Sequence, residues 1–238
     1  MKKQLAITIF VIGLISLGVG CYLSFNIEKE DDNKTNSKDN NDTSVIIKEE
    51  DIKEYSMYNK YKLTVYTKAI KDENTIEVTS EDTIDTESNA IYSSLTMMGT
   101  TIYTYYDLNN GLEYFSSDNT SWSKCENLNM KLPDLTSLIT KVKSLEGVTK
   151  EKGKYTYTTD LVIGEDTYNN ARIDVSFDEK GYLSKIEFDL SNNDDGYDKY
   201  TMIYEFNSIN EVGNVIIPED IVSGAVESDE SHSTYYIS

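Results

Sequence analysis

Two segments of the chain, Ala171–Phe177 and Lys185–Leu190, alternate strictly between apolar and polar residues. Because successive side chains of a β-strand point to opposite faces, this period of two predicts strands with one buried and one exposed face. The connecting residues Asp178–Gly181 are typical of a tight turn, in which Gly181 can adopt a positive φ. The two segments therefore predict a β-hairpin, and consecutive hairpins of this kind build an antiparallel sheet.

Further segments alternate less cleanly but are rich in β-branched and aromatic residues, which favour strands. They are Tyr61–Thr67, Thr75–Val78, Ile91–Tyr106, Leu112–Phe115, Trp122–Cys125, Lys154–Val162 and Tyr200–Phe206. The pair Asn110–Gly111 is a strong signal for a hairpin turn. Together, the segments predict roughly nine or ten strands in one meandering sheet.

One segment, Asp134–Val148, has the period of a helix instead. Its apolar residues form a single stripe, which consists of Leu135, Leu138, Ile139, Val142 and Leu145. Asp134 can cap the first turn, and Gly147 suits a left-handed stop. Because a single apolar stripe has to cover another apolar surface, we expect this helix to pack on the sheet. The predicted fold class is mainly β (α+β), with a curved antiparallel sheet or incomplete β-barrel wrapping one main helix.

Residues 1–27 predict a signal peptide or a transmembrane anchor helix. The 21 residues from Leu5 to Phe25 carry no charge and are long enough to cross a bilayer core. In one interpretation, cleavage after Gly20 leaves Cys21 as a lipid-attachment site. In the other, Cys21 is an apolar residue of an intact transmembrane helix. Lysines before the run and acids after it place the folded part on the extracytoplasmic face of the cell membrane in both cases.

The remaining chain divides into three predicted parts. Residues 28–52 are acidic and rich in asparagine, and they hold too little apolar surface to offset the entropy of ordering, so a disordered linker is expected. Residues 53–226 carry the strands and the helix of the β domain. Residues 227–238 are predicted to be a flexible polar tail.

The charge of the chain excludes one class of partner. It has 42 acidic and 22 basic residues, a formal net charge of −20, which repels the phosphates of nucleic acids. It also argues against docking through a basic patch on anionic lipid. The simplest interpretation is solubility outside the cell, and the alternative is a specific cationic partner.

No catalytic or metal-binding pattern is present. The single histidine, His232, lies in the predicted tail, where it cannot be positioned as a general base. A Ser/His/Asp or Cys/His arrangement would need a second histidine, which the sequence lacks. The acidic segment Asp189–Asp198 fails as a calcium loop, because the register fixed by Gly196 would end at Met202 instead of a glutamate. The two cysteines lack zinc spacing, and Cys125 is expected to be a small core residue. We therefore expect a non-enzymatic protein without a metal or cofactor.

Three segments, in order along the chain, resemble a known family. They are "GLEYFSSDNTSWSKC" at 111–125, "VSFDEKGYLSKIEFDL" at 175–190 and "YEFNSINEVGNVIIPEDIVSGA" at 204–225. They are similar to LolA/LppX-like lipoproteins of Gram-positive bacteria, with a resemblance that spans about residues 55–225. It implies a half-barrel around a helix, with an apolar interior that holds lipid or another apolar ligand and no catalytic residue. The chain departs from the family at Gly18, where leucine is common, and in its strongly acidic charge.

The residues that could line such a cavity belong to two groups. The aromatic group is Tyr103, Tyr105, Tyr114 and Trp122, and the helical group, which could act as a gate, is Leu135, Leu138, Ile139 and Val142. For both groups the alternative is ordinary packing in the core or on the sheet surface.

Two functions follow from these alternatives. One is a membrane-anchored binding protein that holds an apolar ligand. The other is a structural or interaction module of the cell envelope with a packed core, whose acidic outside or sheet edge meets a protein or wall partner. A cavity of about 300 Å³ or more beneath the helix would favour the first, and a filled core the second.

Overall fold

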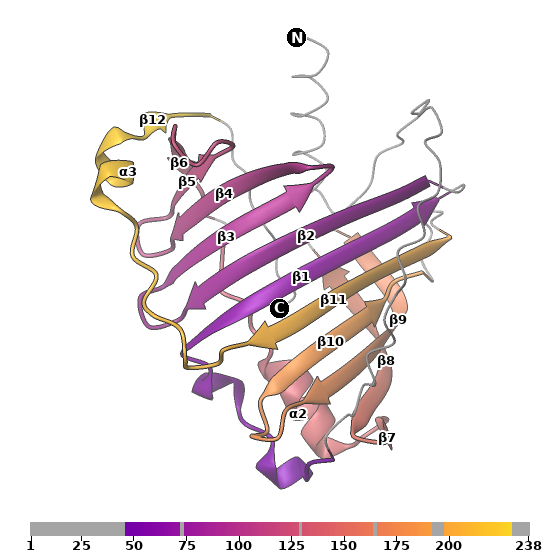
Figure 1. Ribbon diagram of the computed structural model, residues 1–238. Coiled ribbons are helices and arrows are strands. Elements are labelled where there is room, and N and C mark those ends of the chain that lie inside the picture. The colour runs from indigo at the N-terminus through magenta and orange to yellow at the C-terminus, as the bar shows by residue number, and fades with distance from the viewer. Residues whose placement is uncertain (1–45, 72–73, 129, 164–165, 192–197, 230–238) are drawn as a thin grey trace.

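The computed structural model describes residues 46–71, 74–128, 130–163, 166–191 and 198–229. They form one open sheet of twelve strands in the order β12-β6-β5-β4-β3-β2-β1-β11-β10-β9-β8-β7 (Figure 1). All neighbouring strands are antiparallel except β12 and β6. The prediction of a mainly β, antiparallel fold is confirmed. Twelve strands replace the expected nine or ten, and the sheet does not close into a barrel.

The first half of the sheet is a continuous meander. Its strands are β1 Lys60–Lys71, β2 Asn74–Asp85, β3 Ala90–Met97, β4 Thr100–Asp107, β5 Leu112–Ser116 and β6 Ser123–Glu126. The predicted strand region Ile91–Tyr106 is a hairpin in the structure, which turns at Met98 and Gly99 with φ of 48° and 77°. Asn110 and Gly111 lie in the turn before β5, as their sequence predicts.

The second half is built from strands that follow the main helix. They are β7 Thr149–Glu151, β8 Lys154–Ile163, β9 Asp166–Phe177, β10 Leu183–Asp189 and β11 Lys199–Asn207. The predicted hairpin between β9 and β10 is confirmed, and Gly181 in its turn has a φ of 85°. β11 pairs with β1 over nine residues, from Lys62↔Asn207 to Ile70↔Lys199, and so joins the two halves.

The helix α2, Thr136–Ser144, packs on one face of this sheet, here called the inner face (Figure 1). Its buried residues Ile139 and Val142 belong to the same core cluster as Leu63 of β1 and Ile186 of β10. The helix ends at Leu145, which adopts the left-handed conformation with a φ of 56°, so the predicted stop at Gly147 lies two residues too late.

The start of the helix also differs from the expectation. Leu135 occupies the N-cap position, and no side-chain hydrogen bond caps the helix from there. Asp134 instead accepts a hydrogen bond at 2.9 Å from the backbone N–H of Thr136. Asp134 therefore still binds an amide of the first turn, from one position further out than predicted.

The C-terminal segment crosses to the opposite, outer face. Its elements are α3 Glu219–Gly224 and the short strand β12 Val226–Glu227, which pairs in parallel with β6. The backbone N–H of Val215 donates to Asp85 at 3.2 Å, and Lys124 pairs with Glu227 at 3.1 Å. This crossing places α3 beside the meander end of the sheet (Figure 1).

Residues 46–57, here called the N-terminal clamp, pack against the end of the molecule opposite to α3. They contain two short 3₁₀ helices, η1 Glu49–Asp51 and η2 Tyr55–Met57, and the core residues Ile47 and Ile52. Lys150 donates to the carbonyl of Ile47 at 2.9 Å and to Glu49 at 2.5 Å. Residues 46–52 of the predicted linker, residues 28–52, therefore belong to the folded part, and residues 28–45 lie outside the described part.

Candidate functional site

The aromatic residues singled out in the sequence gather on the outer face of β3, β4 and β5. Tyr92, Tyr105 and Tyr114 pair across these three strands and share one face. The ring centroids of Tyr92 and Tyr105 are 4.8 Å apart, and those of Tyr105 and Trp122 are 5.5 Å apart. Tyr92, Tyr103, Tyr105 and Trp122, all half-buried, are here called the outer aromatic surface.

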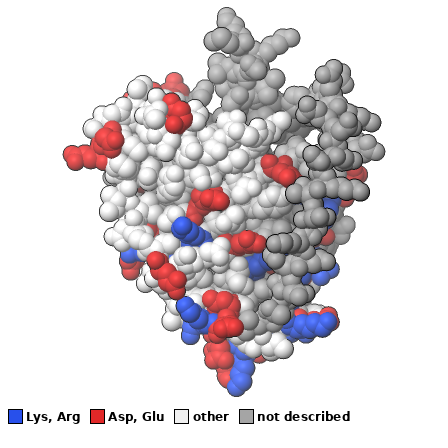
Figure 2. Space-filling model, viewed as in Figure 1, with Lys and Arg blue, Asp and Glu red and all other residues white. Residues whose placement is uncertain are grey.

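The strand period explains why this surface carries no charge. The outer positions of β3 and β4 are filled by aromatic or hydroxyl residues, namely Tyr92, Ser94, Thr96, Thr101, Tyr103 and Tyr105. Figure 2 shows an uncharged area over these strands, with acidic side chains at its margin. Burial raises the pKa of Tyr105, and the nearby carboxylate of Asp220 in α3 raises it further, so the Tyr105 hydroxyl stays protonated.

Tyr114 has a different position from the other aromatic candidates. It is almost fully buried, and burial raises the pKa of its hydroxyl. It lies opposite Lys124 of β6, whose partner Glu227 belongs to the crossing C-terminal segment. Tyr114 therefore lies on the same face as the outer aromatic surface but is covered, so it does not form part of that surface.

The predicted helical group lies on the other side of the sheet. All four residues are buried members of the core, and they are Leu135, Leu138, Ile139 and Val142. The sheet separates them from Tyr105 and Trp122, so the eight candidate residues cannot line one cavity. The structure brings the aromatic group together and brings the helical group together, but it does not join the two.

A buried polar cluster on the inner face was not predicted. Asp82 of β2 accepts hydrogen bonds from the hydroxyls of Ser80 at 2.5 Å and Ser93 at 2.6 Å. Further along the same face, the carboxylate of Glu113 accepts from the amide of Asn127 at 2.7 Å. The signal in the sequence is that β2 and β3 carry polar residues where alternation predicts apolar ones.

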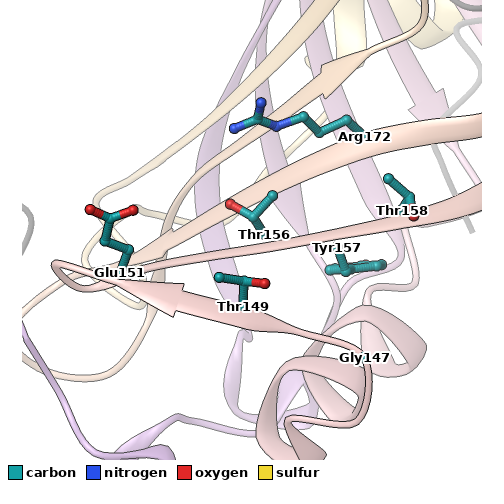
Figure 3. A pocket seen from close by; sticks show the side chains of 7 residues that line it. All are labelled: Gly147, Thr149, Glu151, Thr156, Tyr157, Thr158 and Arg172. Atoms are coloured by element: carbon teal, nitrogen blue, oxygen red, sulfur yellow. The ribbon is translucent and has the colours of Figure 1, made fainter.

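A second surface feature is a pocket of about 430 Å³ at the β7 edge of the sheet (Figure 3). This edge pocket is lined by Gly147, Thr149, Glu151, Thr156, Tyr157, Thr158 and Arg172. None of the predicted cavity residues contributes to it. Its lining was missed because it combines common residue types from three strands and a turn, although Arg172 is the single arginine of the chain.

The charged groups beside the edge pocket are paired. Arg172 donates to Asp174 at 3.3 Å, and Asp174 also accepts from Lys154 at 2.9 Å and Thr156 at 2.6 Å. Burial raises the pKa of Asp174, but the hydrogen bonds from Thr156 and Lys154 outweigh it and hold this pKa below its usual value. The carboxylate therefore stays ionised and positions both cations.

Several predicted features lie outside the described residues, among them Cys21, His232 and most of the acidic segment 189–198. Within the described ranges, no helix is long and apolar enough to span a bilayer, and no group of three or more His, Cys, Asp or Glu residues could hold a metal ion. Cys125 is buried on the inner face of β6, opposite Glu113.

No protein-family model and no curated protein matches the sequence. The resemblance to LolA/LppX-like lipoproteins therefore stays a prediction.

Proposed function

We propose that this protein is a non-enzymatic interaction module of the cell envelope, held at the outer face of the membrane by its N-terminal segment. The observation that supports it most is the filled space beneath α2. Ile139 and Val142 of the helix have no exposed surface, and they pack with Val175 and Ile186 of the sheet. An apolar ligand at this place would have to displace the core of the protein itself.

The outer aromatic surface is the proposed contact with a neutral glycan of the cell wall. Tyrosine and tryptophan rings offer apolar faces on which the C–H groups of a sugar ring can stack, together with a polar edge. The neighbouring hydroxyls of Ser94, Thr96 and Thr101 can both donate hydrogen bonds to sugar hydroxyls and accept them. A ligand without charge also suits this area, which is uncharged on a strongly acidic protein.

Sedimentation with insoluble wall glycan tests this proposal. The purified full chain, kept in detergent micelles, is mixed with cell-wall glycan from which proteins have been stripped. We expect the wild-type chain to pellet with the glycan, and Tyr105→Ala or Trp122→Ala to weaken binding about tenfold. The matched control is Tyr66→Ala, which removes another outer-face tyrosine from β1, away from the surface.

Two results would overturn the proposal. One is equal pelleting of the wild type, Tyr105→Ala and Tyr66→Ala, or no pelleting at all. The other is a lipid that co-purifies with the full chain in native mass spectrometry, because this would favour the carrier of an apolar ligand.

The anchor is a separate part of the proposal. A mass of the membrane-bound chain that retains residues 1–20 would identify an intact transmembrane helix. Loss of those residues together with an added diacylglyceryl group would identify Cys21 as the lipid-attachment site.

A further inference from the structure

The edge pocket lies where the last strand of the sheet stops covering its neighbour. β7 pairs with β8 only through Thr149↔Thr156, Lys150↔Tyr155 and Glu151↔Lys154. β8 continues to Ile163, and within the described residues no strand pairs with it on this side beyond Thr156. Figure 3 shows Gly147 and Thr158 on the two sides of the opening, where the chain bends from β7 toward α2.

The backbone of Thr158 faces this opening. The turn Lys152–Gly153, with φ of 49° and 81°, closes the hairpin at the hydrogen-bonded pair Glu151↔Lys154. Because hydrogen-bonded positions alternate along an antiparallel strand, Lys154 and Thr156 direct their N–H and C=O groups toward β7. Thr158 directs its own to the same side, beyond the position opposite Thr149, the first residue of β7.

The lining of the pocket holds one basic and one acidic side chain, Arg172 and Glu151. Lys150 and Lys154 of the same hairpin are paired with the carboxylates of Glu49 and Asp174. The side chain of Arg172 is 57 % exposed, and its hydrogen bonds to Asp174 use two of the five donors of a guanidinium group.

We propose that the edge pocket binds an extended peptide that carries a carboxylate. The peptide adds to the sheet beside β8, where its backbone pairs with that of Thr158, and its carboxylate binds the guanidinium of Arg172. Strand addition at a free edge provides backbone hydrogen bonds, and a carboxylate on arginine provides a charge-assisted bond that selects among peptides.

The same edge does not suit a second copy of the chain. The pairing of β8 with β9 shifts register between Thr159 and Leu161, so the regular part of the free edge spans only residues 157–159. A stable interface between two copies needs about 1,200 Å² or more of buried surface, which so short an edge cannot provide by itself.

This site is independent of the outer aromatic surface. It lies at the β7 end of the sheet, whereas the aromatic residues lie on β3, β4 and the segment before β6, toward the other end. A failed test of one site therefore leaves the other untouched.

Fluorescence anisotropy with the full chain in detergent micelles tests the proposal. The probe is a dye-labelled pentapeptide of alternating threonine and valine with a free C-terminal carboxylate, and its twin ends in an amide. We expect the acid to bind about tenfold more tightly than the amide, and Arg172→Gln to remove this difference. The matched control is Lys185→Gln, because Lys185 is also an outer-face cation paired with a carboxylate two residues later, Glu187.

A second arm tests the backbone contact. Thr158→Pro removes one N–H from the free edge and should weaken both peptides about tenfold, with the circular dichroism spectrum unchanged. Methylation of the central peptide nitrogen gives the same test without altering the protein. The proposal is overturned if acid and amide bind equally, if Arg172→Gln behaves like Lys185→Gln, or if the methylated peptide binds like its parent. It is also overturned if Thr158→Pro abolishes a dimer of the chain, which would make a second copy the occupant.

Discussion

The inner face of the sheet is buried by different chemistry in its two halves. Over β8 to β11 it is apolar, with Val175, Ile186 and Phe188 packed against α2 and fully buried. Over β2 to β5 it also holds Asp82 and Glu113, with exposures of only 2 % and 0 %. The strands have the same antiparallel geometry in both halves, so the difference does not come from the pairing of the backbone.

This contrast shows that burial by itself does not say what stabilises a sheet. The apolar half is stabilised by the apolar area that folding removes from water. The stability lost on a substitution there grows with the volume of the cavity that it leaves. In the polar half, each buried group needs hydrogen-bond partners, and removal of one partner leaves the others unsatisfied. The two halves should therefore respond differently to single substitutions.

The largest effect is expected in the apolar half. Ile139→Ala removes three buried carbon atoms at the centre of the contact between α2 and the sheet, and should lower the free energy of unfolding by about 2–5 kcal/mol. Urea denaturation measures it. The control Ile216→Ala, at a site with 74 % exposure, should change stability by less than about 0.5 kcal/mol. Equal losses in the two variants would show that the helix does not anchor this half.

A substitution in the β9–β10 turn should displace the N-terminal clamp while it leaves the core side chains of both halves unchanged. In Gly181→Ala the new Cβ would lie 2.1 Å from the carbonyl oxygen of Asp51, at a φ of 85° that alanine disfavours. We expect a loss of about 2–4 kcal/mol, from the backbone strain and the displacement of the clamp. Faster hydrogen exchange in residues 46–57 than in β1 would confirm that the clamp yields first, and uniform exchange would contradict it.

In the polar half, Asp82→Ala should cost about 1–3 kcal/mol, because the hydroxyls of Ser80 and Ser93 lose their shared acceptor. The matched control is Glu81→Ala, which removes the exposed carboxylate next along the strand on the outer face. Urea denaturation of both variants measures the difference. A loss no larger than that of Glu81→Ala would mean that the buried cluster adds nothing to stability.

The smallest effect concerns pH and the clamp. The hydrogen bond from Lys150 lowers the pKa of Glu49, helped by the Glu49 backbone N–H and by the hydroxyl of Tyr155. A lowered pKa in the folded state means that this contribution is complete above about pH 4.3, the value for an unfolded glutamate, and is lost as the pH falls through the folded value.

Glu49→Gln should therefore lose less stability than the wild type between pH 6 and pH 3.5, with a difference below about 1 kcal/mol for a surface pair that keeps more than a quarter of each side chain exposed. Urea midpoints at the two pH values measure it. Glu50→Gln is the control, since Glu50 is a neighbour whose side chain is 73 % exposed and pairs with Lys48. If Glu49→Gln lost as much stability as the wild type between these two pH values, the lowered pKa of Glu49 would not be the source of the pH dependence.

The sequence predicts best where alternation is strict. The hairpin of β9 and β10 and the apolar stripe of α2 were predicted because their apolar residues keep one period throughout. The hairpin at Met98 and Gly99 was not recognised as a turn, because its first residue is an apolar methionine and not the asparagine typical of such turns. The inner face of β2 could not be predicted from sequence for a related reason, since Ser80 and Asp82 occupy buried positions that apolar residues usually fill.

The candidate sites were predictable only in part. The aromatic residues could be named from sequence, but not the face that they share, because this depends on the register between strands that the turns set. The edge pocket depends on the point at which β7 begins, and α3 and β12 depend on a chain that crosses from one face to the other. Such long-range arrangements leave no local signal.

Both outermost strands of the sheet are very short, two residues in β12 and three in β7. An open sheet with long free edges recruits further chains and grows into aggregates, and short edge strands are one way in which natural proteins prevent this. The protection matters most near the isoelectric point of about 4.3, where mutual repulsion between molecules vanishes. In an acidified medium, resistance to fibre formation would then depend on the shape of the two borders and no longer on charge.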